Sequence, residues 1–255
     1  MALNARNVPS SGGKKGPEQE PMDPGTYPAR VVQVIDLGVQ PQRPYKGEEK
    51  APCHEIMMTY EFLDEFCLDE DGEEMEDKPR WLSETFPFRN LEADLATSTK
   101  RYKALDPDMH HDGDFTELVN TPCMVTVVQN AGKGKNAGKV YTNIASVSTM
   151  RAKEARNAAD LVNEPKVFVL DEPDLTIFKS LPQWLQDKIK GNLEYKGSAL
   201  EEALEGAEDD DQEEDKPAPK AKPKKPVKKP AEAPEPDKED EEEEEDEADG
   251  EGEPW

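Results

Sequence analysis

The chain has 255 residues, of which 34% are hydrophobic and 35% are charged, and its formal net charge is −26 at pH 7. The low hydrophobic content indicates fewer folded residues than the length allows. No apolar run approaches the about 20 residues of a membrane span, and no apolar signal segment opens the chain, so we expect a soluble cytoplasmic protein. Its three cysteines, Cys53, Cys67 and Cys123, are far apart, which is typical of reduced thiols.

The acidic residues are concentrated towards the C-terminus. Residues 208–255 contain 22 acidic residues and eight lysines, a net charge of −14, and residues 1–207 carry the other −12. We expect a disordered leader over residues 1–24, a folded core over 25–150, a helical extension packed on the core over 151–207 and a disordered charged tail over 208–255. Because residues 1–207 are also acidic, binding of nucleic acid would require positive charge concentrated in one groove.

Three strands are predicted in the first part of the core, over residues 26–37, 54–66 and 80–88. The first alternates so that Ala29, Val31, Ile35 and Leu37 should share one face. A long loop, residues 38–52, separates the first two strands, and an acidic loop, residues 69–74, separates the next two.

The periodicity then changes to that of a helix over residues 93–105, with Leu91, Leu95, Tyr102 and Leu105 able to face a core. Two further strands, over residues 124–129 and 140–147, form a hairpin around residues 130–139. Three strands, a helix and two strands is the chain order of the OB-fold, a five-stranded Greek-key barrel. We therefore expect a mainly β protein with this barrel as its core.

The segment after the core is predicted to be helical. Residues 151–162 resemble a surface helix, and residues 174–193 carry apolar side chains at helical spacing, namely Phe178, Leu181, Trp184, Leu185 and Ile189. We expect the second helix to dock on the barrel as a packing element.

Aromatic and basic residues recur together in places that an OB-fold brings to one face. Proteins that bind single-stranded DNA without sequence preference combine a positive groove with aromatic side chains on which bases stack. Packing in the core is the alternative role for each aromatic residue, and a solvated turn is the alternative for the lysine-rich hairpin. The candidate DNA-binding residues are Arg43, Tyr45, Lys46, Trp81, Phe86, Phe88, Arg89, Lys100, Arg101, Lys103, Lys133, Lys135, Lys139 and Tyr141.

The tail has a lysine- and proline-rich block over residues 216–230 and an acidic run that ends in Glu253, Pro254 and Trp255. A polyacidic segment can compete with DNA for a basic groove, and a terminal aromatic residue can anchor a partner protein. Charge runs are also simply solvating, which accounts for the acidic residues but not for the tryptophan.

With these features the chain resembles a phage-type single-stranded DNA-binding protein (SSB). The resemblance rests on a core of β-strands, the segment from Phe178 to Lys190, which contains Leu-Pro-Gln-Trp, and the acidic C-terminus with its final aromatic residue. It implies a DNA-binding OB-fold in the cytoplasm of an infected host cell. It also implies roles in DNA replication, recombination and repair, with the tail recruiting DNA polymerase, helicase-primase or nuclease. A homodimer is a further expectation.

No enzyme signature is found, and neither a cofactor nor a metal is expected. The glycine- and lysine-rich hairpin departs from a phosphate-binding loop, and the cysteine and histidine spacing matches no standard zinc site. Two alternatives stay open. An acidic interaction factor or DNA mimic that binds basic partners would suit the net charge, and a DNA-processing enzyme is a weaker alternative.

Overall fold

The structure is a computed structural model that describes residues 19–44 and 46–214, with side chains up to residue 207. The chain divides into two compact units, residues 1–215 and 216–255, and the second lies outside the described part. The leader up to residue 18 and the tail from residue 215 onwards therefore stay predictions, whereas the expectation of disorder is wrong for residues 19–24, where Met22 is buried among apolar residues of the strands. Residues 208–214, expected to be part of the tail, belong to the last helix.

Strands dominate the fold, as the sequence predicts, and helices are few. The described residues form six strands: β1 (Gly25–Gln40), β2 (Cys53–Leu68), β3 (Glu74–Pro87), β4 (Pro122–Ala131), β5 (Val140–Thr149) and β6 (Lys166–Phe168). The helices are α1 (Thr97–Leu105), α2 (Ala152–Ala155), α3 (Leu175–Ser180), α4 (Gln183–Lys190) and α5 (Ala199–Glu214), with short 3-10 turns at Thr116–Leu118 and Gly134–Asn136.

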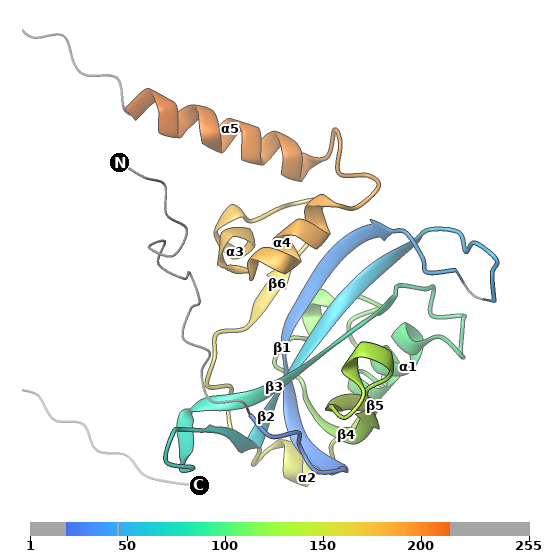
Figure 1. Cartoon of the computed structure of the whole chain (residues 1–255), viewed down its shortest axis with the longest axis vertical. Helices are drawn as coiled ribbons and strands as arrows, with labels where there is room; N and C mark the ends of the chain where they lie inside the picture. Colours follow the sequence, from blue (N-terminus) through green and yellow to red (C-terminus); the bar gives the residue numbers. More distant parts are fainter. Residues whose placement is uncertain (1–18, 45, 215–255) are drawn as a thin grey trace, which may run out of the picture. The chain divides into compact units, whose positions relative to one another are not determined.

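The strands form one sheet in the order β3-β2-β1-β4-β5, and β6 pairs with β1. All pairs are antiparallel except the short parallel pair of β1 and β6. In the described residues no hydrogen-bonded ladder joins β3 to β5, so the sheet is open and the expected closed five-stranded barrel is not confirmed. Figure 1 shows the long, curved β1 and β2 with α3 and α4 at one end and α2 at the other.

Two irregularities in β1 decide which side chains face which core. Its pairing with β2 shifts register between Val31 and Gln33 and again between Asp36 and Gly38. A bulge of this kind moves the following residues to the opposite face of a strand. The prediction that Val31 and Ile35 share a face is therefore wrong: Val31 lies in the first core and Ile35 in a second.

The first core contains side chains of β1, β2, β3, β4 and β5 and is covered by α1. Tyr60, Phe62 and Tyr102 are fully buried in it. The helix starts at Thr97 rather than at residue 93, because Asn90 accepts backbone hydrogen bonds in a turn that competes with the helix. As a result, the predicted core residue Leu95 is 88% exposed.

The second core joins the other face of β1 and β2 to a helical layer. Phe178, Leu185, Ile189 and Leu200 are buried there against the strands and β6. The predicted helix over residues 174–193 is divided into α3 and α4, because a residue that precedes proline avoids the helical conformation, and Leu181 before Pro182 has ψ 150°. In the described ranges no helix combines the length and apolar composition that a membrane span requires.

Candidate functional site

The two faces of β3 have different environments. Leu82, Glu84 and Phe86 point towards the first core, whereas Trp81 and Thr85 are exposed on the outer face. This follows from the alternation of side chains along a strand. Phe86 is only 4% exposed, so this predicted DNA-binding residue is a core residue and its ring cannot stack on a base. The sequence could not decide which face Trp81 occupies.

A buried carboxylate fixes the orientation of Trp81. The indole Nε1 donates to Glu61 Oε2 over 3.0 Å, and the Trp81 residue is 39% exposed. Glu61 is fully buried, and it also accepts hydrogen bonds from the backbone of Val162 and from the backbone and side chain of Asn163. The carboxylate is satisfied by these donors, as buried charges must be. The indole is held in place while part of it stays accessible.

A polar cavity of about 530 Å³ lies between the β1–β2 loop, β3 and α4. This volume is in the range of ordinary ligand sites. Its lining includes three cations and one carboxylate, a net charge of +2 in a chain whose total is −26. The lining residues are Gln40, Pro41, Gln42, Arg43, Pro44, Lys50, Glu55, Thr85 and Lys188.

One carboxylate lies between two donors inside this cavity. Lys188 Nζ donates to Glu55 Oε2 over 2.9 Å, and Gln42 Nε2 donates to Glu55 Oε1 over 2.9 Å. The Glu55 side chain is 15% exposed and that of Lys188 32%. Arg43 is exposed and forms no ion pair with any residue in the described part of the chain. The cavity thus contains a carboxylate, that of Glu55, which already has two donors, and a cation, Arg43, which forms no ion pair in the described residues.

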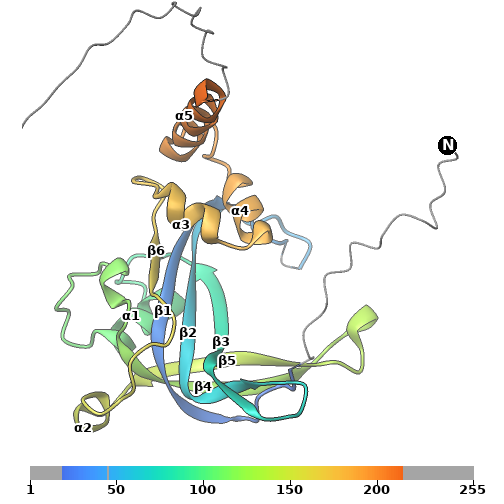
Figure 2. The same ribbon diagram turned by 90° about the vertical axis from the view of Figure 1, so that its left-hand side faces the viewer.

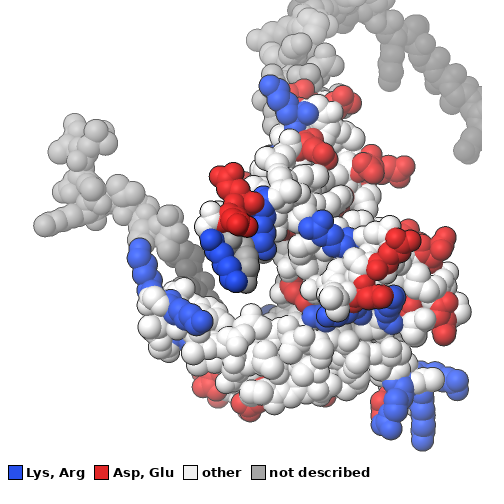
Figure 3. Space-filling view, turned by 90° about the vertical axis from the view of Figure 1, so that its right-hand side faces the viewer, with Lys and Arg blue, Asp and Glu red and all other residues white. Residues whose placement is uncertain are grey.

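The lysines of the β4–β5 hairpin, Lys133, Lys135 and Lys139, are all exposed, and Tyr141 beside them is 42% exposed. Figure 2 shows the end of this hairpin and the β1–β2 loop projecting towards the same side of the sheet, on the right in that view. In Figure 3 basic side chains stand on both sides of a hollow at the left of the molecule. The fold therefore brings two of the predicted basic loops to one side.

The basic residues of α1, Lys100, Arg101 and Lys103, do not lie on the side of the sheet that carries the β1–β2 loop and the β4–β5 hairpin. Arg101 is buried, and its guanidinium binds both oxygens of Glu84, with Nε to Oε1 at 2.6 Å and Nη2 to Oε2 at 2.9 Å. This arrangement corrects the prediction that Arg101 contacts DNA. Lys100 is exposed, and Lys103 pairs with Asp94 at 2.7 Å. Figure 2 places α1 on the opposite side of the molecule from the hairpin end.

The end of β3 carries the remaining predicted residues. Phe88 is 39% exposed, and its ring makes edge contacts with His54 and Phe115 at centroid distances of 5.5 and 5.3 Å. It therefore extends the core and leaves a partly exposed edge. Arg89 is exposed. Tyr45 and the tail residues Glu253, Pro254 and Trp255 lie outside the described residues.

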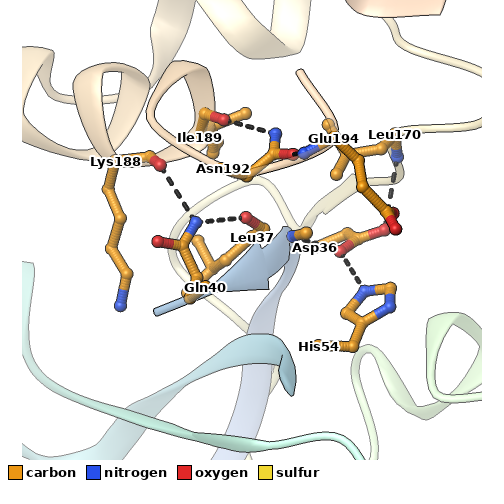
Figure 4. Close-up of polar contacts among 10 residues, drawn as sticks. Asp36, Leu37, Gln40, His54, Leu170, Lys188, Ile189, Asn192 and Glu194 are labelled. Carbon is orange, nitrogen blue, oxygen red and sulfur yellow. Dashed lines mark hydrogen bonds and ion pairs between the residues drawn. The ribbon is translucent and has the colours of Figure 1, made fainter. Parts of the chain in front are cut away.

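Polar contacts fasten the helical layer to the strands next to the cavity, as Figure 4 shows. Asp36 Oδ1 contacts His54 Nε2 at 2.5 Å and accepts from the backbone of Gly38 at 2.8 Å. The hydrogen bond to Asp36 raises the pKa of His54 even though burial opposes the charged imidazole. Gln40 donates to the backbone carbonyl oxygens of Leu37 and of Lys188 on α4. The position of α4 beside the cavity is thus set by contacts with β1.

Sequence reasoning missed Lys188 and Glu61. The α4 segment was interpreted as a packing helix, and the lysines on its polar face gave no signal of what they contact. Glu61 lies in the strand predicted over residues 54–66, and nothing in the sequence distinguishes it from other polar residues of that strand. Both residues act through partners far away in the chain, and a local pattern contains no information on such partners.

No protein-family model matches this chain, and a search of curated proteins found no significant match. Among the described residues no group of three or more histidine, cysteine, aspartate or glutamate side chains is placed to hold a metal ion.

Proposed function

We propose that this protein binds single-stranded DNA without sequence preference and performs no catalysis. The observation that carries the proposal is the net-positive cavity at the β1–β2 loop, which leads onto the outer face of β3. Thr85 lines the cavity, and Trp81 lies four residues away on the same face, a distance of about 13 Å along a strand. Cations that could bind phosphate, together with an exposed aromatic ring on the same face, are the two components of a single-strand binding surface.

We infer further that the core is an OB-fold. The sheet order is compatible with this fold, and α1 lies between the third and fourth strands in the chain, as the fold requires. Some Cα atoms of β3 and β5 lie within 8 Å of each other although no ladder joins the two strands. In an OB-fold, nucleic acid binds on the face of the second and third strands and at the loops beside it.

The interface would consist of the cavity, the exposed face of β3 and the hairpin end. The cations are Arg43, Lys46, Lys133, Lys135 and Lys139, to which Lys188 is added, and the stacking residues are Trp81 and Tyr141. Phe88 and Arg89 would contribute only at the margin, since Phe88 is committed to two ring contacts.

The biological setting also stays a proposal. The resemblance to phage SSBs supports a role in DNA replication, recombination and repair in the cytoplasm of an infected cell. The acidic tail would compete with DNA for the basic surface by Coulomb attraction and would recruit replication proteins such as polymerase and helicase-primase.

An acidic interaction factor is the second candidate, and the negative charge of residues 1–207 favours it. Such a protein would bind basic partners through its acidic surface, for example through the β2–β3 loop with its run of acidic residues 69–74. It would have no affinity for an oligonucleotide.

Fluorescence anisotropy of a labelled oligo-dT distinguishes the two candidates. The full-length protein and a version that ends at residue 214 would each be titrated at increasing salt. The shorter version keeps every residue of both buried clusters. We expect both to bind, the shorter one more tightly, with log K falling by about 0.7 per phosphate contact for each tenfold rise in salt. If neither version binds at about 50 mM salt, the proposal is refuted and the acidic interaction factor is favoured.

A further inference from the structure

We propose that Glu55 is a built-in substitute for phosphate, and that a phosphate group of the DNA strand competes with it for the cations of the cavity. The inference rests on the proposed function and deepens it. It assigns a phosphate subsite to the junction of the β1–β2 loop with α4, and it makes Lys188 of the helical layer a DNA-binding residue.

The chemistry of the seated anion supports this assignment. A carboxylate and a phosphodiester each present two equivalent oxygens that accept hydrogen bonds from lysine, arginine and side-chain amides. Glu55 uses one oxygen for Gln42 of the loop and the other for Lys188 of the helix, each at 2.9 Å. An anion that bridges these two elements is therefore already part of the architecture, and a phosphate can make the same contacts.

The charges of the cavity favour an additional anion. Lys188 is paired with Glu55, and Arg43 of the same cavity forms no ion pair in the described residues, so the positive charge of Arg43 is available to a further anion. Lysine has three N–H donors, so Lys188 can bind a phosphate while it keeps or releases Glu55. Figure 4 shows the Lys188 side chain leaving α4 on the side of the strands, and its backbone carbonyl is fixed by Gln40 of β1. The cation is thus presented from a fixed helix.

The position of Glu55 also sets the cost of binding. Its carboxylate repels an incoming phosphate and occupies one donor of Lys188. DNA binding must overcome both effects, so Glu55 should lower the affinity for DNA. It should also reduce the number of cations that neutralise phosphates and thereby release counterions from the DNA. Replacing it with glutamine keeps the shape and the oxygen that accepts from a donor, but removes the charge.

The test is oligo-dT anisotropy at several salt concentrations with full-length Glu55→Gln and Lys188→Gln variants. We expect Glu55→Gln to bind about three- to tenfold more tightly, with a salt slope steeper by about 0.7, because one more cation is available to phosphate. Lys188→Gln should bind about three- to tenfold more weakly, with a slope shallower by the same amount. The double variant should bind within about threefold of the unmodified protein, since it removes one positive and one negative charge and leaves the net charge of the cavity unchanged.

Two exposed residues of the same layer provide matched controls. Glu172→Gln and Lys179→Gln change the net charge by the same amounts at sites away from the cavity lining, and each should alter affinity less than about twofold. A gain of affinity in Glu55→Gln cannot result from misfolding, which would weaken binding. If the unmodified protein binds while Glu55→Gln and Lys188→Gln behave like their controls, the phosphate subsite is wrong and the proposed function survives. If the unmodified protein does not bind at all, both proposals fail.

Discussion

Arg101→Met should destabilise the fold strongly, because the Arg101 side chain is buried. The side chains of Arg101 and Glu84 are 7% and 15% exposed and form a bidentate pair, and the Tyr60 hydroxyl donates to the same carboxylate at 2.9 Å. Burial and the charge of Glu84 raise the pKa of Tyr60 well above its usual value, so its hydroxyl stays a proton donor. Removal of the guanidinium would leave the carboxylate with Tyr60 as its remaining side-chain donor in the described part of the chain.

Two estimates give the magnitude. Charges about 4 Å apart at an effective dielectric constant of about 20 attract each other by about 4 kcal/mol. Breaking a buried pair from one side typically costs about 3–5 kcal/mol. We therefore expect the free energy of unfolding to fall by about 3–4 kcal/mol at pH 7.

Urea denaturation followed by circular dichroism measures this loss. Lys100→Met is the matched control, because Lys100 is exposed on the same helix and its loss should cost less than about 0.5 kcal/mol. A deficit of less than about 1 kcal/mol at pH 7 would refute the burial argument.

Three further predictions concern the strands and the helical layer. Gly38→Ala should lower the free energy of unfolding by about 2 kcal/mol or more in urea titrations, because φ is +70° and the new Cβ would lie 2.8 Å from two side chains. Gly47→Ala is the control: its φ is also positive, but no atom lies within 4 Å of the new Cβ, so it should cost only about 1 kcal/mol. Because the pKa of His54 is raised in the folded protein, the protonated imidazole stabilises the fold. This contribution is fully present below the unfolded pKa of about 6.5 and is lost as the pH rises through the raised pKa. His54→Gln should abolish this part of the pH dependence of urea unfolding, and an unchanged profile would contradict the prediction. Burial raises the pKa of Cys123 to about 12, so iodoacetamide at about pH 8 should alkylate the half-buried Cys67 and spare Cys123, which peptide mass spectrometry can check; equal labelling of the two would count against the burial.

Local patterns predicted the order of the five long strands and α1 correctly, but they missed β6, and residues 151–162, expected to form a surface helix, contain only the short α2. Alternation identified the strands, the change of period identified α1, and glycine-rich residues identified the β4–β5 hairpin, because these signals lie within one element. The β1 bulges were not visible in the same way. Alternation assumes a regular strand, so Val31 and Ile35 were assigned to one face, and only the pairing with β2 separates them.

The site depended more strongly on tertiary structure. The sequence determined by itself that lysines would occupy the hairpin and that Trp81 and Phe86 would lie in the third strand. It could not tell that Phe86 faces the core and Trp81 the outside, because a period of two defines two faces without saying which is buried.

The same holds for the cations, since residue type fixes the charge of a side chain but not its partner. Three basic residues lie close together in α1, yet packing against Glu84 removes Arg101 from the surface. Lys188 and Glu55 are 133 residues apart in the chain and lie 2.9 Å apart in the cavity. The sequence thus determined the charges and the periodicity of this protein. Only the tertiary structure decided which charges neutralise each other, because Coulomb interactions and desolvation depend on distances in space.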